Sequence, residues 1–155
     1  MNVETRQARA QDAKALRALV EVVLPAAYDP IHPGYAEREL LAWDVEDIPA
    51  ALEDGAFVVA EVQGRIIGLV SATIDERDRF VMSTLHVHPD FQGHRLGTRL
   101  LNEVADLVDD RALWTRYPEG DDNAAAFCER HGFVVAETVA DPPFPPQVWA
   151  RLDRD

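Results

Sequence analysis

The chain has 155 residues, of which 47% are hydrophobic, and this length and composition predict one globular domain over residues 1–155. Acidic residues outnumber basic ones 28 to 15, and the net charge of −13 argues against nucleic acid as a ligand because a negative field repels polyanions. The single cysteine, Cys128, excludes an internal disulfide and any metal site made of several cysteines.

The first twenty residues contain no apolar signal core, and no later segment approaches the length of a membrane span. We therefore expect a cytoplasmic protein that makes no membrane contact. A first helix is predicted over residues 12–25, ended by Pro25, because apolar residues recur there at helical spacing (Leu16, Leu19, Val20, Val23 and Leu24). The next segment, residues 28–49, is rich in proline and glycine, and it predicts a loop with a short helix over 36–43.

Two apolar segments rich in β-branched residues, 56–62 and 65–75, are separated by Gln63 and Gly64 and predict a hairpin. A charged turn leads into a third strand over 80–88. Helical spacing returns after a polar loop, from Leu100 to Val108. The remaining elements are a short strand at 112–117, a helix at 123–130 and strands at 133–139 and 148–152, with the proline-rich segment 142–146 predicted as the last connection.

The segment 85–98 is the most informative part of the sequence. A strand runs there into a loop with Gly93 and Gly97 that opens a helix, so backbone N–H groups and the helix dipole converge on one spot suited to phosphate. A plain strand-to-helix turn is the alternative. A P-loop is excluded because Thr98 follows Gly97 directly, and the dinucleotide motif G-x-G-x-x-G is absent.

Two motifs occur in the chain in this order. The pattern L-x-V-x-P followed by Q-x-x-G-x-G is matched at Leu85, Val87, Pro89, Gln92 and Gly97, and A-x-x-F-Y-x-x-x-G-F is approached at Ala124, Phe127, Gly132 and Phe133. Together they resemble the motifs of the GNAT superfamily of acetyltransferases. The resemblance implies an α/β (α+β) GNAT fold, with a mixed, mostly antiparallel central sheet of six to seven strands flanked by about four helices. It implies transfer of an acetyl group from acetyl-CoA, as co-substrate, directly to a primary amine of a small molecule or peptide.

The resemblance also implies where acetyl-CoA binds. In the family, backbone groups of the L-x-V strand pair with the pantetheine arm, the loop after it holds the pyrophosphate, and a strand N–H can stabilise the oxyanion. The implied acetyl-CoA residues are Leu85, His86, Val87, Gln92, Gly93, His94, Arg95, Leu96, Gly97, Thr98, Asn123 and Phe127.

Several positions depart from the family pattern. Arg95 replaces the middle glycine, and a left-handed backbone there would cost about 1–2 kcal/mol, which a bond to phosphate would offset. Cys128 stands where many relatives have a tyrosine that protonates the departing thiolate, so it is either a general acid or an apolar filler. Asp121 stands at the usual asparagine position and Asn123 follows, so either could contact CoA or only cap the helix.

The general base is not defined by the sequence. Positions that carry Glu or His in several relatives fall at Val81 and Ser83, and neither side chain is a base, although Ser83 is kept as a candidate catalytic residue because of its position. His86 is a candidate base or proton relay, with a structural histidine as the alternative. His86 and His88 alternate on one strand, but a metal site would need a third ligand, so we expect no metal.

The acceptor site is expected in the loop before residue 49, where four side chains supply aromatic and polar groups: Tyr28, His32, Tyr35 and Trp43. For Tyr35 and Trp43, packing of the short helix is an equal alternative. A GNAT-fold module that binds CoA as a sensor or scaffold without turnover is the alternative function, and a partner-binding domain without a CoA site is a third. A homodimer stays open, since it is the commonest closed assembly.

Overall fold

A computed structural model describes residues 2–108 and 110–154. Its centre is a seven-stranded sheet in the order β1-β2-β3-β4-β5-β7-β6, in which only β4 and β5 are parallel. The strands are β1 (Glu4–Gln7), β2 (Gly55–Val62), β3 (Arg65–Ile74), β4 (Phe80–Val87), β5 (Leu113–Pro118), β6 (Val134–Asp141) and β7 (Phe144–Leu152). The described helices are α1 (Ala13–Tyr28), α2 (Tyr35–Leu40), α3 (Ile48–Asp54), α4 (Leu96–Leu107) and α5 (Asp122–Arg130), with short 3₁₀ turns at Ala10–Asp12, Leu41–Trp43 and Pro89–Phe91.

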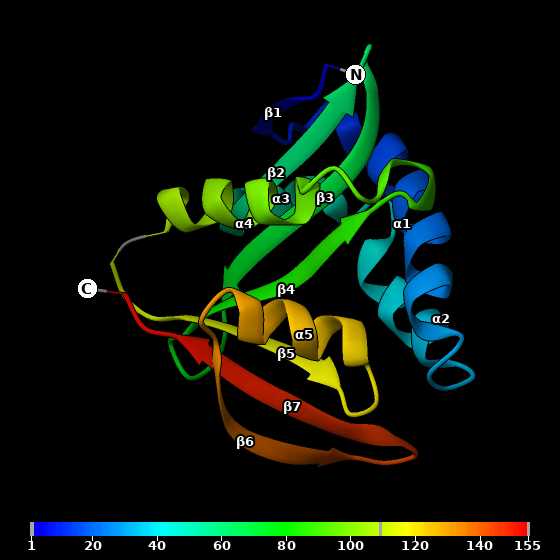
Figure 1. Ribbon diagram of the computed structural model, residues 1–155. Helices are drawn as coiled ribbons and strands as arrows, with labels where there is room; N and C mark the ends of the chain where they lie inside the picture. Colours follow the sequence, from blue (N-terminus) through cyan, green and yellow to red (C-terminus); the bar gives the residue numbers. More distant parts are fainter. Residues whose placement is uncertain (1, 109, 155) are drawn as a thin grey trace.

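The sheet is covered on both faces because successive side chains of β2 point to opposite sides. Val58 and Ala60 join the core under α4 and α5, whereas Phe57 and Val59 join the core under α1. Figure 1 shows α4 in front of β2 and β3, and β6 and β7 at the end of the sheet opposite β1. The predicted fold class is thus confirmed.

Three local predictions need correction. Helix α1 continues through Pro25 to Tyr28, because a proline in the last turn removes only one N–H from the helix. Helix α3 was not predicted, and Pro49 lies in its first turn, where the missing N–H has no intrahelical partner to lose. Strand β1 was missed because it is a short strand with a polar sequence at the sheet edge.

The predicted connection at 142–146 is shorter than expected. Strand β7 already begins at Phe144 and contains Pro145 and Pro146. These prolines fall where the β6–β7 register is irregular, between the pairs Val139–Gln147 and Asp141–Phe144, so they replace no regular ladder bond. No helix among residues 2–108 and 110–154 is long and apolar enough to cross a membrane.

Candidate active site

The site begins where the parallel strands β4 and β5 separate. They pair only from Phe80–Leu113 to Met82–Thr115, so the edge of β4 beyond Met82 has no β5 partner. Its other edge stays paired with β3 as far as Val87. Backbone N–H and C=O groups of Leu85 to Val87 therefore face a gap in the sheet and are available to pair with an extended amide chain.

A cavity of about 1370 Å³ occupies this gap. Its walls come from the free end of β4, the loop after it, the first turn of α4, the end of β5, α5 and the C-terminal part of α1. Eleven of the twelve residues predicted to bind acetyl-CoA line this cavity, and the exception is His94, which is exposed on the loop. Because α1 lies on one face of the sheet and α4 and α5 lie on the other, the cavity reaches both faces.

A β-bulge lies at the fork between the strands. Ser71 of β3 pairs with Thr84 and Ala72 pairs with Met82, so Ser83 is an additional residue on β4 with no β3 partner. Ser83 is exposed and lines the cavity. A bulge frees a backbone N–H from the ladder at the point where the cavity crosses the sheet.

The N-terminus of α4 forms one end of the cavity. No side chain caps this helix, and the first intrahelical bond reaches Arg99 N, so the N–H groups of Leu96, Gly97 and Thr98 lack intrahelical partners. In contrast, Asp121 caps α5 by accepting a hydrogen bond from Ala124 N at 3.1 Å. The α4 terminus thus has free donors and the positive end of a dipole, as an anion site requires.

Arg95 adopts the left-handed conformation considered above, with φ of 58° and ψ of 27°. Its side chain is exposed at the cavity rim and makes no hydrogen bond or ion pair with a described residue. Arg116 and Arg130 also line the cavity, against the carboxylates of Asp121 and Asp122. The cavity thus gathers arginine side chains although the chain has a net charge of −13, which suits a polyanionic ligand.

The two helices beside this terminus are held together by side chains. Thr98 Oγ1 and His131 Nε2 lie 3.0 Å apart, and the His131 ring stacks on Phe127 with centroids 4.3 Å apart. A Cβ atom added to Gly97 would lie 3.4 Å from Phe127. A side chain at position 97 would thus begin in ordinary van der Waals contact with Phe127 of α5. Because Asp121 is the cap of α5, Asn123 is left free on the cavity wall.

His86 lies on the free edge of β4, partly buried, with its ring edge-on to Tyr28 at 5.7 Å. Burial lowers the pKa of His86 to about 4. At neutral pH His86 is therefore unprotonated but a weak proton acceptor, and this environment favours a neutral wall residue over a general base. His88 does not share the cavity, and it accepts a hydrogen bond from Asp90 N at 3.1 Å.

Cys128 lines the cavity but is only 6% exposed and belongs to the core under α4 and α5. Burial, followed by the nearby Asp121 carboxylate, raises the pKa of the Cys128 thiol to about 11. This environment favours the apolar filler over the general acid. Among residues 2–108 and 110–154, no three His, Cys, Asp or Glu side chains form a group that could hold a metal ion.

Of the four predicted acceptor residues, only Tyr28 lines the cavity. Tyr35 and Trp43 are 1% and 8% exposed, and their aromatic rings pack on Phe144 and Phe57. The His32 ring lies against Phe144 with Nδ1 2.8 Å from Pro33 O. Tyr35 and Trp43 are therefore packing residues and His32 lies outside the cavity, so the positions of these three side chains do not support contact with substrate.

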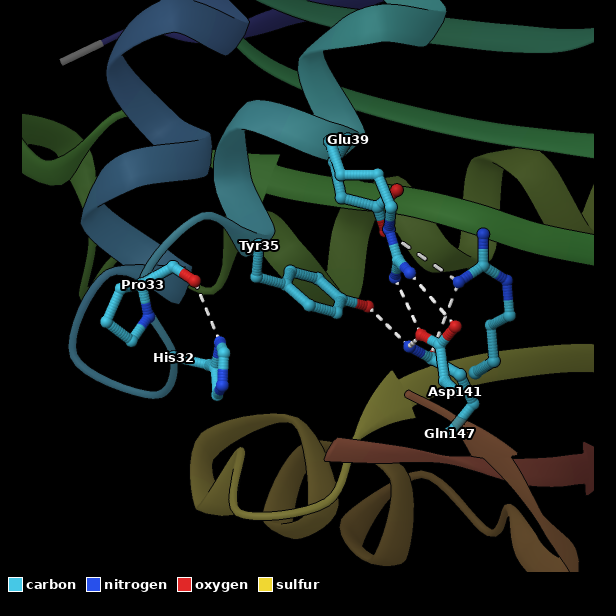
Figure 2. Close-up of polar contacts among 8 residues, drawn as sticks. His32, Pro33, Tyr35, Glu39, Asp141 and Gln147 are labelled. Carbon is cyan, nitrogen blue, oxygen red and sulfur yellow. Dashed lines mark hydrogen bonds and ion pairs between the residues drawn. The ribbon is translucent and has the colours of Figure 1, made fainter. Parts of the chain in front are cut away.

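A polar network fixes α2 to the β6–β7 end of the sheet. Gln147 donates to the Tyr35 hydroxyl at 2.8 Å and to Asp141 at 3.0 Å, and Arg38 binds Asp141 with two bonds of 2.9 and 2.8 Å. Figure 2 shows Tyr35, Asp141 and Gln147 pointing toward one another beside α2. The second half of the segment 28–49 is thus anchored to the sheet, and the cavity is bounded by α1 and residues up to Ile31.

Sequence reasoning missed several cavity residues: Val23, Ala26, Ala27, Pro30, Ile31, Thr115, Arg116, Tyr117, Arg130 and His131. Strand β5 was predicted over nearly its full length, but no function was given to it. The alternation of Thr115, Arg116 and Tyr117 could have indicated two faces. That their strand ends at the fork follows only from the pairing of β4 with β5.

The chain is similar in sequence and in fold to known proteins. The model of the acetyltransferase (GNAT) family matches residues 16–133, and the chain belongs to that family. The match includes both motifs that indicated the resemblance in the sequence, which is thereby confirmed.

Two relatives are each 30% identical to the chain. One is the uncharacterized N-acetyltransferase MJ1207 of Methanocaldococcus jannaschii, over 118 residues, 68% of this chain and 50% of that protein. The other, named as a probable N-acetyltransferase, is camello of Xenopus tropicalis, over 103 residues, 64% of this chain and 47% of that protein. The chain thus spans about half the length of these relatives.

Solved structures share the fold over the whole chain. The PaiA N-acetyltransferase of Thermoplasma acidophilum, determined with coenzyme A, has a TM-score of 0.83 at 16% identity, with 100% of both chains covered. The YncA structure of Salmonella typhimurium, determined with acetyl-CoA, has a TM-score of 0.70 at 18% identity, covering 100% of this chain and 95% of that one. At these identities the likeness establishes the fold alone.

Proposed function

We propose that the chain is an N-acetyltransferase that moves an acetyl group from acetyl-CoA directly to a primary amine of a small molecule or peptide. The observation that carries this proposal is the cavity that crosses the sheet at the β4–β5 fork, with an uncapped helix N-terminus at one end. The family membership and the two solved relatives that hold coenzyme A or acetyl-CoA support it.

The residues present fit acetyl-CoA as co-substrate. When bound, it supplies an acetyl group activated as a thioester. The free N–H groups of Leu96, Gly97 and Thr98 would hold the pyrophosphate, with Arg95 at the rim as a further cation. The unpaired edge of β4 from Leu85 to Val87 would bind the amide-containing arm in the manner of an added strand.

The chain contributes chiefly by positioning. The bulge at Ser83 would direct a backbone N–H at the acyl oxygen, where developing negative charge is stabilised. The opposite mouth, lined by Tyr28 and Ile31 of the α1 side, would hold the amine against the acyl carbon. Alignment of two bound reactants contributes about 7–11 kcal/mol in well-oriented cases, without a covalent enzyme intermediate.

The experiment that tests this function has two parts. Calorimetric titration with acetyl-CoA should show binding, and release of free CoA should be detected with one or more members of a panel of small and peptidic primary amines. Binding without release for any amine would support the sensor or scaffold module instead. Absence of acetyl-CoA binding would contradict both.

Tyr28 provides a test of the acceptor site. Tyr28→Ala removes a ring from the cavity wall and should raise KM for an identified amine about tenfold, since one lost apolar contact of about 1.4 kcal/mol has that effect. His32→Ala is the matched control, because His32 does not line the cavity. Steady-state kinetics would contradict the placement if KM rose equally in both variants.

A further inference from the structure

We propose that Tyr117 is the catalytic residue that protonates the departing CoA thiolate, in place of the α5 residue Cys128. This inference rests on the proposed function. Tyr117 belongs to β5 and is one of the cavity residues that the sequence did not indicate. Its side chain is 9% exposed and lies in the same core cluster as Cys128.

The Tyr117 hydroxyl has no hydrogen-bond partner among the residues that the structure describes. It makes no hydrogen bond with any residue of 2–108 or 110–154, whereas Tyr35 shares a hydrogen bond with Gln147 and Thr115 donates to Met82 O at 2.8 Å. Among the described residues, Arg6 Nε is the one side-chain nitrogen or oxygen that is buried from solvent and has no hydrogen-bond partner. The Tyr117 hydroxyl is therefore not one of the fully buried polar atoms. The Tyr117 side chain lines the cavity, and its hydroxyl is not sealed from solvent.

Strand geometry places this hydroxyl on the side of the sheet where CoA would enter. Thr115 is the last β5 residue paired with β4, and Tyr117 lies two residues further, on the same face. That face carries α4 and α5, including the free α4 terminus. The neighbouring Arg116 points to the other face, where it meets Glu39 of α2 at 3.7 Å. A thioester reaching the fork from the α4 side would pass the Tyr117 ring.

The chemistry suits a phenol at this place. Transfer forms a bond between the amine nitrogen and the acetyl carbon and breaks the bond from that carbon to sulfur, so the amine loses a proton and the sulfur must gain one. Burial, followed by the nearby Cys128 and Asp121, raises the pKa of Tyr117, so the phenol holds its proton at neutral pH as the Cys128 thiol does, and the pKa values do not separate the two candidates. Tyr117 would give its proton to the thiolate and recover one from cavity water. A phenol donates a stronger hydrogen bond than the S–H group of Cys128.

The first measurement needs no amine. CoA and desulfo-CoA should differ in affinity for the wild type, by about 2- to 10-fold in favour of CoA, if the hydroxyl donates to sulfur. Tyr117→Phe, which keeps the ring, should abolish this difference and leave desulfo-CoA affinity unchanged. An equal ratio in wild type and Tyr117→Phe would overturn the assignment.

The second measurement is turnover with an amine that the wild type acetylates. Tyr117→Phe should lower kcat at least about 100-fold with acetyl-CoA affinity retained, the range typical of a lost proton donor. Tyr35→Phe, which removes a hydroxyl outside the cavity, is the matched control and should keep kcat. Tyr117→3-fluorotyrosine, a stronger acid, should move the basic limb of the kcat profile to lower pH.

Other outcomes point elsewhere. A comparable loss in Tyr28→Phe or Cys128→Ala, with wild-type kcat in a stable Tyr117→Phe, would assign the donor to the α1 side or to α5 and overturn the proposal. A wild type that binds acetyl-CoA and acetylates no amine would remove the transferase function and the donor role with it. The affinity ratio would then still decide whether the hydroxyl lies at sulfur.

Discussion

Gly97→Asp should lower the affinity for acetyl-CoA at least about 100-fold. Gly97 lies in the first turn of α4, where its N–H is free and Phe127 lies beside it. A carboxylate there would repel the pyrophosphate, fill the space it needs and compete for the same donors. Two lost charge-assisted hydrogen bonds, each contributing about 1.5–3 kcal/mol, already account for an effect of that size.

The substitution should leave the fold intact. Gly97 has no positive φ, and an acidic residue in a first helical turn is favourable. Asn102→Asp adds the same charge to an exposed position of α4 outside the main cavity and is the matched control. Calorimetric titration of both variants, with unfolding curves, decides the matter. Wild-type affinity in a folded Gly97→Asp would refute the assignment of this terminus.

His86 should make the protein lose about 1–3 kcal/mol of stability as the pH falls from 6.5 to 4. Burial lowers the pKa of His86 to about 4 in the folded state, against an ordinary 6.5. Between these two pH values the unfolded chain carries a proton on His86 that the folded chain does not. The free energy of unfolding therefore decreases as the pH decreases. The stability that neutral His86 contributes is fully present above pH 6.5. Below pH 4 the folded state is protonated too, and no further stability is lost through this residue.

The measurement is urea unfolding of wild type and His86→Gln at pH 7 and pH 4.5. His86→Gln should remove most of the difference between the two pH values. A smaller dependence should remain, because burial also lowers the pKa of His131 in the same direction. His94→Gln, at an exposed loop position, should behave as wild type. If the difference between the two pH values were undiminished in His86→Gln, the pKa of His86 would not be lowered in the folded protein.

Gly97 and His86 belong to the part of the site that the sequence predicted. The motif from Leu85 to Thr98 was sufficient to predict a strand, a phosphate loop and a helix terminus, because each depends on local spacing and backbone geometry. The acceptor side could not be predicted in this way. Tyr28, Tyr35 and Trp43 look equivalent in the sequence, and only the packing of α2 on Phe144 and of Trp43 on Phe57 separates the wall residue from the core residues.

The sequence by itself determined the fold family, most strands and helices, and the position of the loop that opens α4. These properties follow from period, turn residues and a motif, all of which are local along the chain. The tertiary structure alone decided which residues meet at the fork of β4 and β5. Tyr117 and His86 lie far apart in sequence and come to one cavity because the two strands separate after Met82 and Thr115. Burial then sets their pKa values, and burial is a property of the assembled fold.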